Sequence, residues 1–142
     1  MRILIADGQS KVRFALQVLL ERQPGLEVVG EAVYAQDLLA QAEATQPELV
    51  LLSWELSCLA QVGSLSALRQ ACPDLRVIAL SGRPEARQAA LDAGADAFVS
   101  KIDPPERLLA AIGACEREQR EAKEEKRKER IDNPTEKRKL AT

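Results

Sequence analysis

The chain contains no histidine among its 142 residues. Histidine is the general base of Ser-His and Cys-His nucleophiles and the commonest metal ligand, so its absence excludes those enzyme classes and histidine-based metal sites. Aromatic residues make up only 3% of the sequence, whereas hydrophobic residues as a whole make up 46%. The chain can therefore bury a substantial core, and we expect that core to be aliphatic.

Long hydrophobic runs are also missing. No apolar run approaches the ~18 residues that a membrane span requires, and the apolar opening at residues 1–6 is too short for a signal peptide. The three cysteines, Cys58, Cys72 and Cys115, are odd in number and lack CxxC spacing. We expect reduced thiols, and neither a disulfide framework nor a zinc site. These features predict a cytoplasmic protein with no membrane partner.

Charge is distributed unevenly along the chain. Residues 1–115 contain 10 basic and 14 acidic residues, whereas residues 116–142 contain 10 basic and 8 acidic ones. This change predicts a domain at 1–115, followed by a charged helical extension and tail at 116–142. Residues 116–130 pair opposite charges at helical spacing. We expect a solvated continuation of the last helix, stopped at Asp132-Asn133-Pro134, and then a solvated tail.

Two hydrophobic periods alternate before that point. Short apolar runs rich in β-branched residues predict strands, and stretches with apolar residues at helical spacing predict helices between them. Pro84 opens the fourth predicted helix and Gly94 ends it, while Asp103 and Pro104-Pro105 open the fifth. This order predicts an α/β fold, a (βα)5 doubly wound five-stranded parallel sheet of order 2-1-3-4-5 with an extended C-terminal helix. The predicted strands are 2–6, 26–32, 48–53, 76–81 and 97–100.

Sheets of this kind place their sites at the carboxyl ends of the strands, beside the first and third strands. The candidate site residues at these ends are Asp7, Gly8, Ser53, Ser81, Gly82 and Lys101.

Here the chain resembles response-regulator receiver domains of two-component systems, over nearly all of residues 1–115. The matching stretches are Ile-Leu-Ile-Ala-Asp-Gly-Gln-Ser-Lys-Val-Arg, Pro-Glu-Leu-Val-Leu-Leu-Ser-Trp-Glu-Leu, Val-Ile-Ala-Leu-Ser-Gly and Ala-Leu-Asp-Ala-Gly-Ala-Asp-Ala-Phe-Val-Ser-Lys. The last stretch, with the following Pro-Pro-Glu-Arg-Leu-Leu, is similar to the branch usually fused to helix-turn-helix output domains.

The resemblance implies a phosphorylation site that this chain has partly lost. In the family, two acidic residues after the first strand and an Asp after the third hold Mg²⁺, and the third Asp accepts the phosphoryl group. A Ser or Thr and a Lys then hold the phosphoryl oxygens. Asp7 keeps the first acidic position, Gly8 replaces the second, and Ser53 replaces the acceptor. Ser81 and Lys101 match the family.

Phe98 stands at the family's aromatic switch position, three residues before Lys101. The resemblance implies that it couples the site to the face formed by helix 4, strand 5 and helix 5, where receivers dimerise or meet partners. We interpret Trp54 as a packing residue beside the site. The loop from Leu56 to Gln61 lacks the family's Met-Pro and turn residues, which suggests that it no longer responds to a phosphoryl group.

These departures predict a degenerate receiver, or pseudo-receiver. Of the three carboxylates of the family site, only Asp7 is present, so we expect no useful Mg²⁺ affinity and no cofactor. The Ser53 hydroxyl also lacks the general base that a serine nucleophile needs. We expect no enzyme activity, and a protein-interaction module in phosphorelay signalling. Its expected partners are signalling proteins, such as a histidine kinase or another regulator, or a second copy bound through the helix 4 face. No helix-turn-helix follows, so we do not expect DNA binding.

Several alternatives stay open. At the site, Lys101 could pair with Asp7 while water satisfies the hydroxyls, which we favour. Ser81, the backbone N–H groups near Gly82 and Lys101 could instead form a cradle for an anion. For function, the alternative is a working receiver that accepts phosphate at an unorthodox residue. A small enzyme on the same fold ranks further behind, because no Gly-rich phosphate loop follows the first strand.

Overall fold

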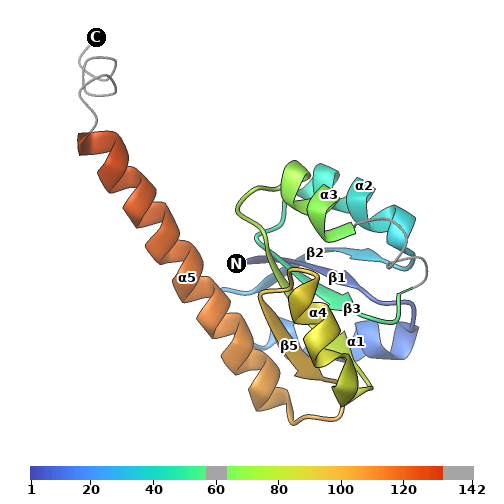
Figure 1. Ribbon diagram of the computed structural model, residues 1–142. Helices are drawn as coiled ribbons and strands as arrows, with labels where there is room; N and C mark the ends of the chain where they lie inside the picture. The colour runs from blue at the N-terminus through green and yellow to red at the C-terminus, as the bar shows by residue number, and fades with distance from the viewer. Residues whose placement is uncertain (57–63, 133–142) are drawn as a thin grey trace.

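The computed structural model describes residues 1–56 and 64–132. Its five strands form one parallel sheet of order β2-β1-β3-β4-β5, with helices on both faces (Figure 1). This confirms the predicted architecture, and each predicted strand limit agrees within one residue. The strands are β1 Arg2–Ala6, β2 Glu27–Ala32, β3 Leu49–Ser53, β4 Arg76–Ser81 and β5 Ala97–Ser100.

The helices also follow the predicted order. The predicted fourth helix begins with a 3₁₀ turn, and Gly94 after its end has a φ of +109°, which glycine adopts without strain. Within the described ranges, no helix is long and apolar enough to cross a membrane. The helical elements are α1 Ser10–Glu21, α2 Ala35–Thr45, α3 Ser64–Ala71, η2 Pro84–Ala86, α4 Arg87–Asp92 and α5 Pro105–Asp132.

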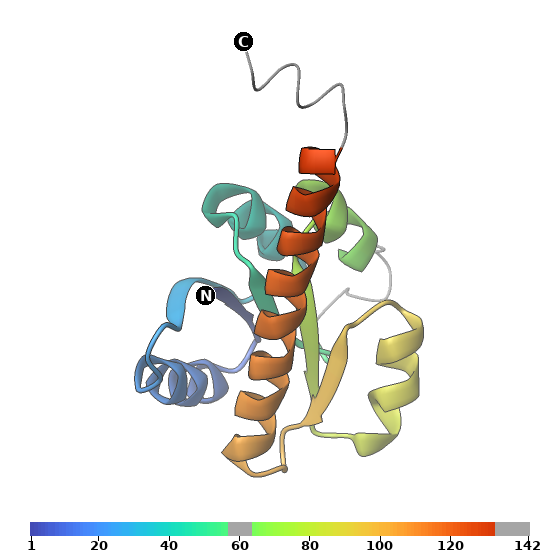
Figure 2. The ribbon, with the colours of Figure 1, turned by 90° about the vertical axis from the view of Figure 1, so that its left-hand side faces the viewer.

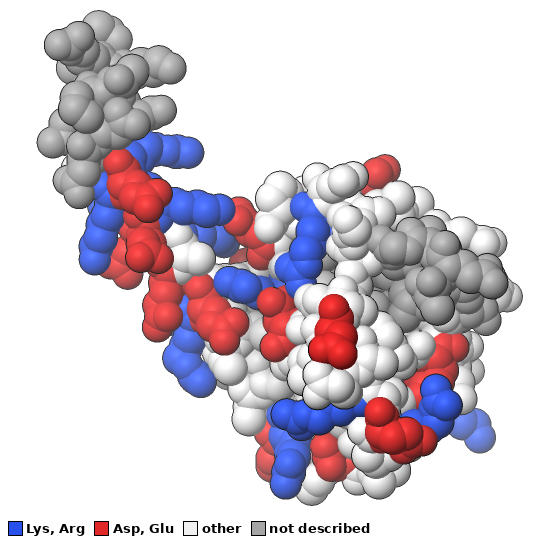
Figure 3. Space-filling model, in the orientation of Figure 1, with Lys and Arg blue, Asp and Glu red and all other residues white. Residues whose placement is uncertain are grey.

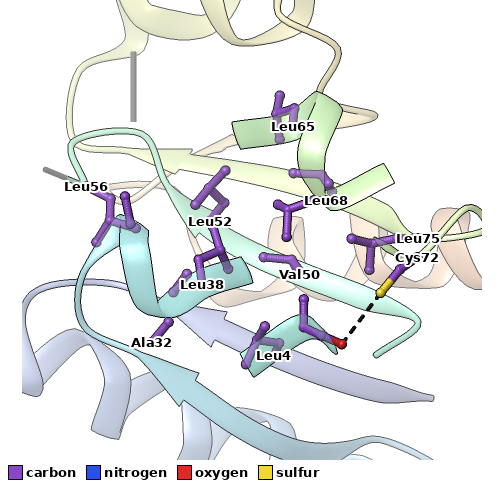
Figure 4. Close-up of a cluster of buried hydrophobic side chains, with 14 residues drawn as sticks. Leu4, Ala32, Leu38, Val50, Leu52, Leu56, Leu65, Leu68, Cys72 and Leu75 are labelled. Atoms are coloured by element: carbon purple, nitrogen blue, oxygen red, sulfur yellow. Dashed lines mark hydrogen bonds between the residues drawn. The ribbon is translucent and has the colours of Figure 1, made fainter. Parts of the chain in front are cut away.

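The central strands are apolar throughout because both faces of the sheet are covered. Successive side chains of a strand point to opposite faces. In β1, Ile3 and Ile5 therefore pack against α1 and α5, whereas Leu4 packs against α2 and α3. Figure 4 shows the second of these cores, which is built almost wholly from aliphatic side chains. Aliphatic side chains thus supply almost all of the apolar volume of both layers, although aromatic residues are scarce.

The described cysteines agree with the prediction of reduced thiols. Cys72 and Cys115 are free and buried, and the Cys72 thiol donates a weak hydrogen bond of 3.6 Å to the carbonyl oxygen of Ala42 (Figure 4). Burial raises the pKa of Cys72 and raises the pKa of Cys115 to about 11. Both thiols therefore stay protonated and unreactive at neutral pH. Cys58 lies outside the described residues.

Helix α5 continues without a break across the predicted boundary at residue 115 and reaches Asp132, as predicted. Figure 2 shows it running along the whole domain, with its last turns beyond the other elements. Figure 3 shows both signs of charge interspersed along these turns. The predicted tail at 133–142 lies outside the described residues.

The prediction of a solvated extension holds for most residues from 116 to 126, which are exposed, but it is wrong for Gln119. The Gln119 side chain is buried and donates hydrogen bonds of 2.5 and 2.9 Å to the carbonyl oxygens of Glu48 and Asp74. Lys126 lies 2.7 Å from the Asp74 carboxylate. These contacts hold α5 against the loops that lead into β3 and β4, so the extension is part of the domain as far as Lys126.

Candidate functional site

The predicted site lies at the carboxyl ends of the strands. Parallel strands bring these ends to one edge of the sheet, and a pocket of about 570 Å³ opens there. Five of the six predicted residues line it, and the sixth, Ser81, is fully buried beside it. The lining residues are Asp7, Gly8, Gln9, Val33, Tyr34, Ser53, Glu55, Leu56, Gly82, Arg83 and Lys101.

Asp7 and Lys101 form the predicted ion pair. Asp7 follows β1 and is only 2% exposed. Its Oδ1 accepts a hydrogen bond of 2.8 Å from the backbone N–H of Gln9, and its Oδ2 lies 3.0 Å from Nζ of Lys101. Lys101 is held in place after β5 by its own N–H, which donates to the carbonyl oxygen of Ser81 at 2.8 Å. The buried carboxylate is therefore neutralised by the chain itself.

Lys101 also reaches Ser53, which stands at the position where the family resemblance implies a phosphoacceptor. Ser53 ends β3 and is 3% exposed, and its Oγ accepts a hydrogen bond of 3.0 Å from Nζ of Lys101. One ammonium group thus bridges Asp7 and Ser53. The predicted residues Asp7, Ser53 and Lys101 come together around one ammonium group, which forms an ion pair with Asp7 and a hydrogen bond with Ser53.

Glu55 is a site residue that the sequence analysis missed. The Ser81 hydroxyl donates a hydrogen bond to Oε1 of Glu55, and the Ser53 hydroxyl donates one of 3.4 Å to Oε2. The expectation that water satisfies these hydroxyls is therefore wrong, because a carboxylate of the chain does so. The position of Glu55 in the sequence could have identified it as a site residue. A charged residue two positions after a central strand lies at the same edge as the other strand ends.

Two cations lie near the Glu55 carboxylate. Nζ of Lys101 is 3.9 Å from Oε2, and Nε of Arg83 is 3.9 Å from Oε1. The backbone N–H of Arg83 also donates to the Ser81 hydroxyl at 3.0 Å, which fixes the loop after β4. Ser81 and Lys101 thus both contact an anion, as the cradle alternative requires, and this anion belongs to the chain.

Gly8 is exposed and its surroundings are open. A Cβ atom added there would meet the carbonyl oxygen of Val33 at 3.7 Å, an ordinary van der Waals contact. Packing therefore does not require a glycine at position 8, where the family resemblance implies a second acidic residue. No group of three His, Cys, Asp or Glu side chains that could hold a metal occurs among residues 1–56 and 64–132.

The predicted switch residue Phe98 is half-buried. It packs with Trp54 against a small alanine cluster that includes Ala90 of α4. Trp54 also packs against the core under α2 and α3, which agrees with its predicted packing role. Trp54, which follows Ser53 directly in the chain, thus packs against the same cluster as Phe98.

Comparison with known proteins identifies the class. The family model of the response regulator receiver domain matches residues 3–113, so the chain belongs to the response regulator receiver domain family of two-component signalling. A Bacillus subtilis protein, "Uncharacterized transcriptional regulatory protein YhcZ", is 33% identical over 111 residues, which are 77% of this chain and 52% of that protein. The chain thus spans about half the length of this curated relative.

Solved structures agree with this assignment. A LuxR-family two-component response regulator from Aurantimonas sp. SI85-9A1 has a TM-score of 0.72 and 29% identity, covering 80% of this chain and 82% of that one. A CheY-like receiver domain protein from Methanospirillum hungatei JF-1 has a TM-score of 0.73 and 28% identity, covering 85% and 97%. Because relatives include a transcriptional regulatory protein and a LuxR-family regulator, the comparisons do not support our expectation that the protein does not bind DNA.

Proposed function

We propose that this receiver domain is a pseudo-receiver that signals through protein contacts and does not accept a phosphoryl group. The observation that carries the proposal is the bridge by Lys101, whose ammonium nitrogen lies 3.0 Å from Asp7 Oδ2 and 3.0 Å from Ser53 Oγ. A hydroxyl stands where the family has its acceptor carboxylate, and it is bound to a cation. We expect a cytoplasmic protein without enzyme activity.

The residues of the site do not fit Mg²⁺. This ion prefers a near-octahedral set of oxygen ligands that includes carboxylates. Position 8 is glycine, position 53 is serine, and Asp7 already has Lys101 within 3.0 Å. A cation entering beside Asp7 would meet the lysine charge at short range. We therefore propose that the domain folds and functions without metal.

The residues also do not favour phosphorylation of Ser53. A serine attacks a phosphoryl donor only when a general base removes its proton. The Ser53 hydroxyl donates a hydrogen bond of 3.4 Å to Glu55 and accepts one from Lys101. Its contact with Glu55 is the specific observation in favour of the alternative, an unorthodox acceptor, because that carboxylate is the nearest candidate base. The neighbouring Lys101 and the length of this contact weigh against it.

We propose the surface formed by α4, β5 and α5 as the contact face. In support, Phe98 of β5 and Trp54, which follows Ser53 in the chain, pack against one alanine cluster that includes Ala90 of α4. We propose that this face binds another signalling protein, such as a histidine kinase or another regulator, or a second copy of this chain. Sedimentation of the purified protein tests the last possibility.

Incubation with acetyl phosphate and MgCl₂, followed by intact mass measurement, tests the proposal. We expect no species heavier by the mass of one phosphoryl group, ~80 Da. The variant Ser53→Ala is the matched control, since any adduct that survives this substitution lies elsewhere. A phosphorylated species in the wild type that Ser53→Ala abolishes would establish the unorthodox acceptor and overturn the pseudo-receiver.

A further inference from the structure

The carboxylate of Glu55 lies where four donor or cationic groups of the site converge. It accepts hydrogen bonds from the hydroxyls of Ser81 and Ser53, and Lys101 and Arg83 each approach it to 3.9 Å. Ser81 and Ser53 are 0% and 3% exposed, whereas the Glu55 side chain is 37% exposed. The carboxylate therefore joins two buried hydroxyls to a side chain that is partly exposed to solvent.

This arrangement balances charge without any added ion. The site contains two carboxylates, Asp7 and Glu55, and two cations, Lys101 and Arg83. Removing Glu55 would leave one excess positive charge beside two buried hydroxyls. Hydroxyls and basic groups that converge in this way bind oxyanions well. Glu55 thus has the chemistry of an anion that occupies an oxyanion site.

The family resemblance already implies a subsite for phosphoryl oxygens at Ser81 and Lys101. We propose that in this chain Glu55 occupies that subsite from within, as a built-in substitute for a tetrahedral oxyanion of the phosphate or sulfate class. Ser81 and Lys101 hold the Glu55 carboxylate with the groups that the family uses for phosphoryl oxygens. Glu55, two residues after β3, is consequently held by contacts within the chain. The inference rests on the proposed function, because it describes how a site that is not phosphorylated is kept in one state.

A titration with inorganic phosphate tests the proposal. We would follow the backbone amide signals of Ser81, Gly82 and Arg83 in the wild type and in Glu55→Ala, with chloride at equal ionic strength as the control for screening. We expect saturable shifts in Glu55→Ala, and at least tenfold weaker binding in the wild type. Equal affinity in the two proteins, or no saturable shift in Glu55→Ala, would overturn the inference.

Two further variants sharpen the test. Glu55→Gln keeps the length of the side chain and removes its charge, so it should also gain phosphate binding and carries the test if Glu55→Ala does not fold. Adding Lys101→Met to either variant should abolish the gain. Glu85→Ala, an exposed acidic residue in η2, is the matched control and should behave like the wild type. If Glu85→Ala gained as much phosphate binding as Glu55→Ala, the gain would be an effect of net charge, and the proposed site would be rejected.

Failure of the inference and failure of the proposed function give different signals. The phosphate titration measures reversible, non-covalent binding, and the mass measurement with acetyl phosphate detects a covalent adduct. A covalent adduct at Ser53 in the wild type rejects both. Absence of any adduct together with an unresponsive Glu55→Ala rejects only the role of Glu55.

Discussion

Nζ of Lys101 lies 3.0 Å from Oδ2 of Asp7, and the Asp7 side chain is only 2% exposed. In a receiver with three clustered carboxylates, the acidic residues repel one another and removing one relieves the repulsion. In this chain, neutralising Asp7 would instead remove the close anionic partner of Lys101, a lysine that is itself largely buried. The pair therefore stabilises the fold, where an acidic cluster would destabilise it.

The first prediction follows for Asp7→Asn. We expect this variant to lose about 1–3 kcal/mol of unfolding free energy, because it leaves Lys101 without its closest charge partner. Urea unfolding followed by circular dichroism measures the loss. Asp37→Asn, at an exposed position of α2, is the control and should change stability by no more than about 0.5 kcal/mol. An Asp7→Asn protein more stable than the wild type would mean that the site behaves as a repulsive acidic cluster.

The second prediction concerns the double variant Gly8→Asp, Ser53→Asp. It restores three carboxylates, and the added Cβ at position 8 has room at 3.7 Å from the nearest atom. Repulsion should lower its melting temperature without metal, and millimolar MgCl₂ should raise that temperature again. The wild type should show no such rise beyond that produced by KCl of equal ionic strength. A wild-type midpoint that rises with MgCl₂ as much as that of the double variant would contradict the loss of the metal site.

The sheet could be predicted from the sequence because its central strands are covered on both faces and their side chains are therefore apolar. Unbroken apolar runs such as residues 49–52 occur where both faces are covered, and all four side chains are fully buried. The predicted site follows from the same topology, since parallel strands bring Asp7, Ser53 and Lys101 to one edge. These parts of the structure depend on periodicity and strand order, which a single sequence contains.

The missed features depend on where polar side chains turn in three dimensions. Glu55 reads as an exposed loop charge, and its role appears only when Ser81, 26 residues later, donates a hydrogen bond to it. Gln119 lies in a run of charged residues that predicts a solvated helix. Its burial depends on two carbonyl oxygens, at Glu48 and Asp74, whose position is set by the loops before β3 and β4. No helical periodicity encodes that contact.

The third prediction tests the docking of α5. Gln119→Ala removes both hydrogen bonds, so the carbonyl oxygen of Asp74 loses its donor from Gln119. We therefore expect the free energy of unfolding to fall by about 1–2 kcal/mol. Amide hydrogen exchange at residues 116–126 should become faster, because these turns are held by few other contacts. Gln36→Ala, exposed on α2, is the control. Unchanged stability and exchange in Gln119→Ala would show that the extension is not held by this residue.

The last prediction is a pH dependence of the outermost contact of α5. The hydrogen bond from Lys126 lowers the pKa of Asp74 below its ordinary value of 3.8. A carboxyl group whose pKa is lower in the folded chain stabilises the fold at pH values above its unfolded pKa, and this contribution is lost as the pH falls through the lowered value. The side chains are 60% and 65% exposed, so the contribution should not exceed about 1 kcal/mol.

A double-mutant cycle with Asp74→Asn and Lys126→Met measures this coupling directly. We expect a favourable coupling energy at pH 7 that decreases towards pH ~2, because the carboxyl group gains its proton as the pH falls through its lowered pKa. Raising the salt concentration at pH 7 should reduce the coupling in the same direction, since exposed charges are screened. A coupling that persists unchanged at pH ~2 would mean that Lys126 docks through its aliphatic stem, and that the ion pair contributes nothing to holding α5 on the domain.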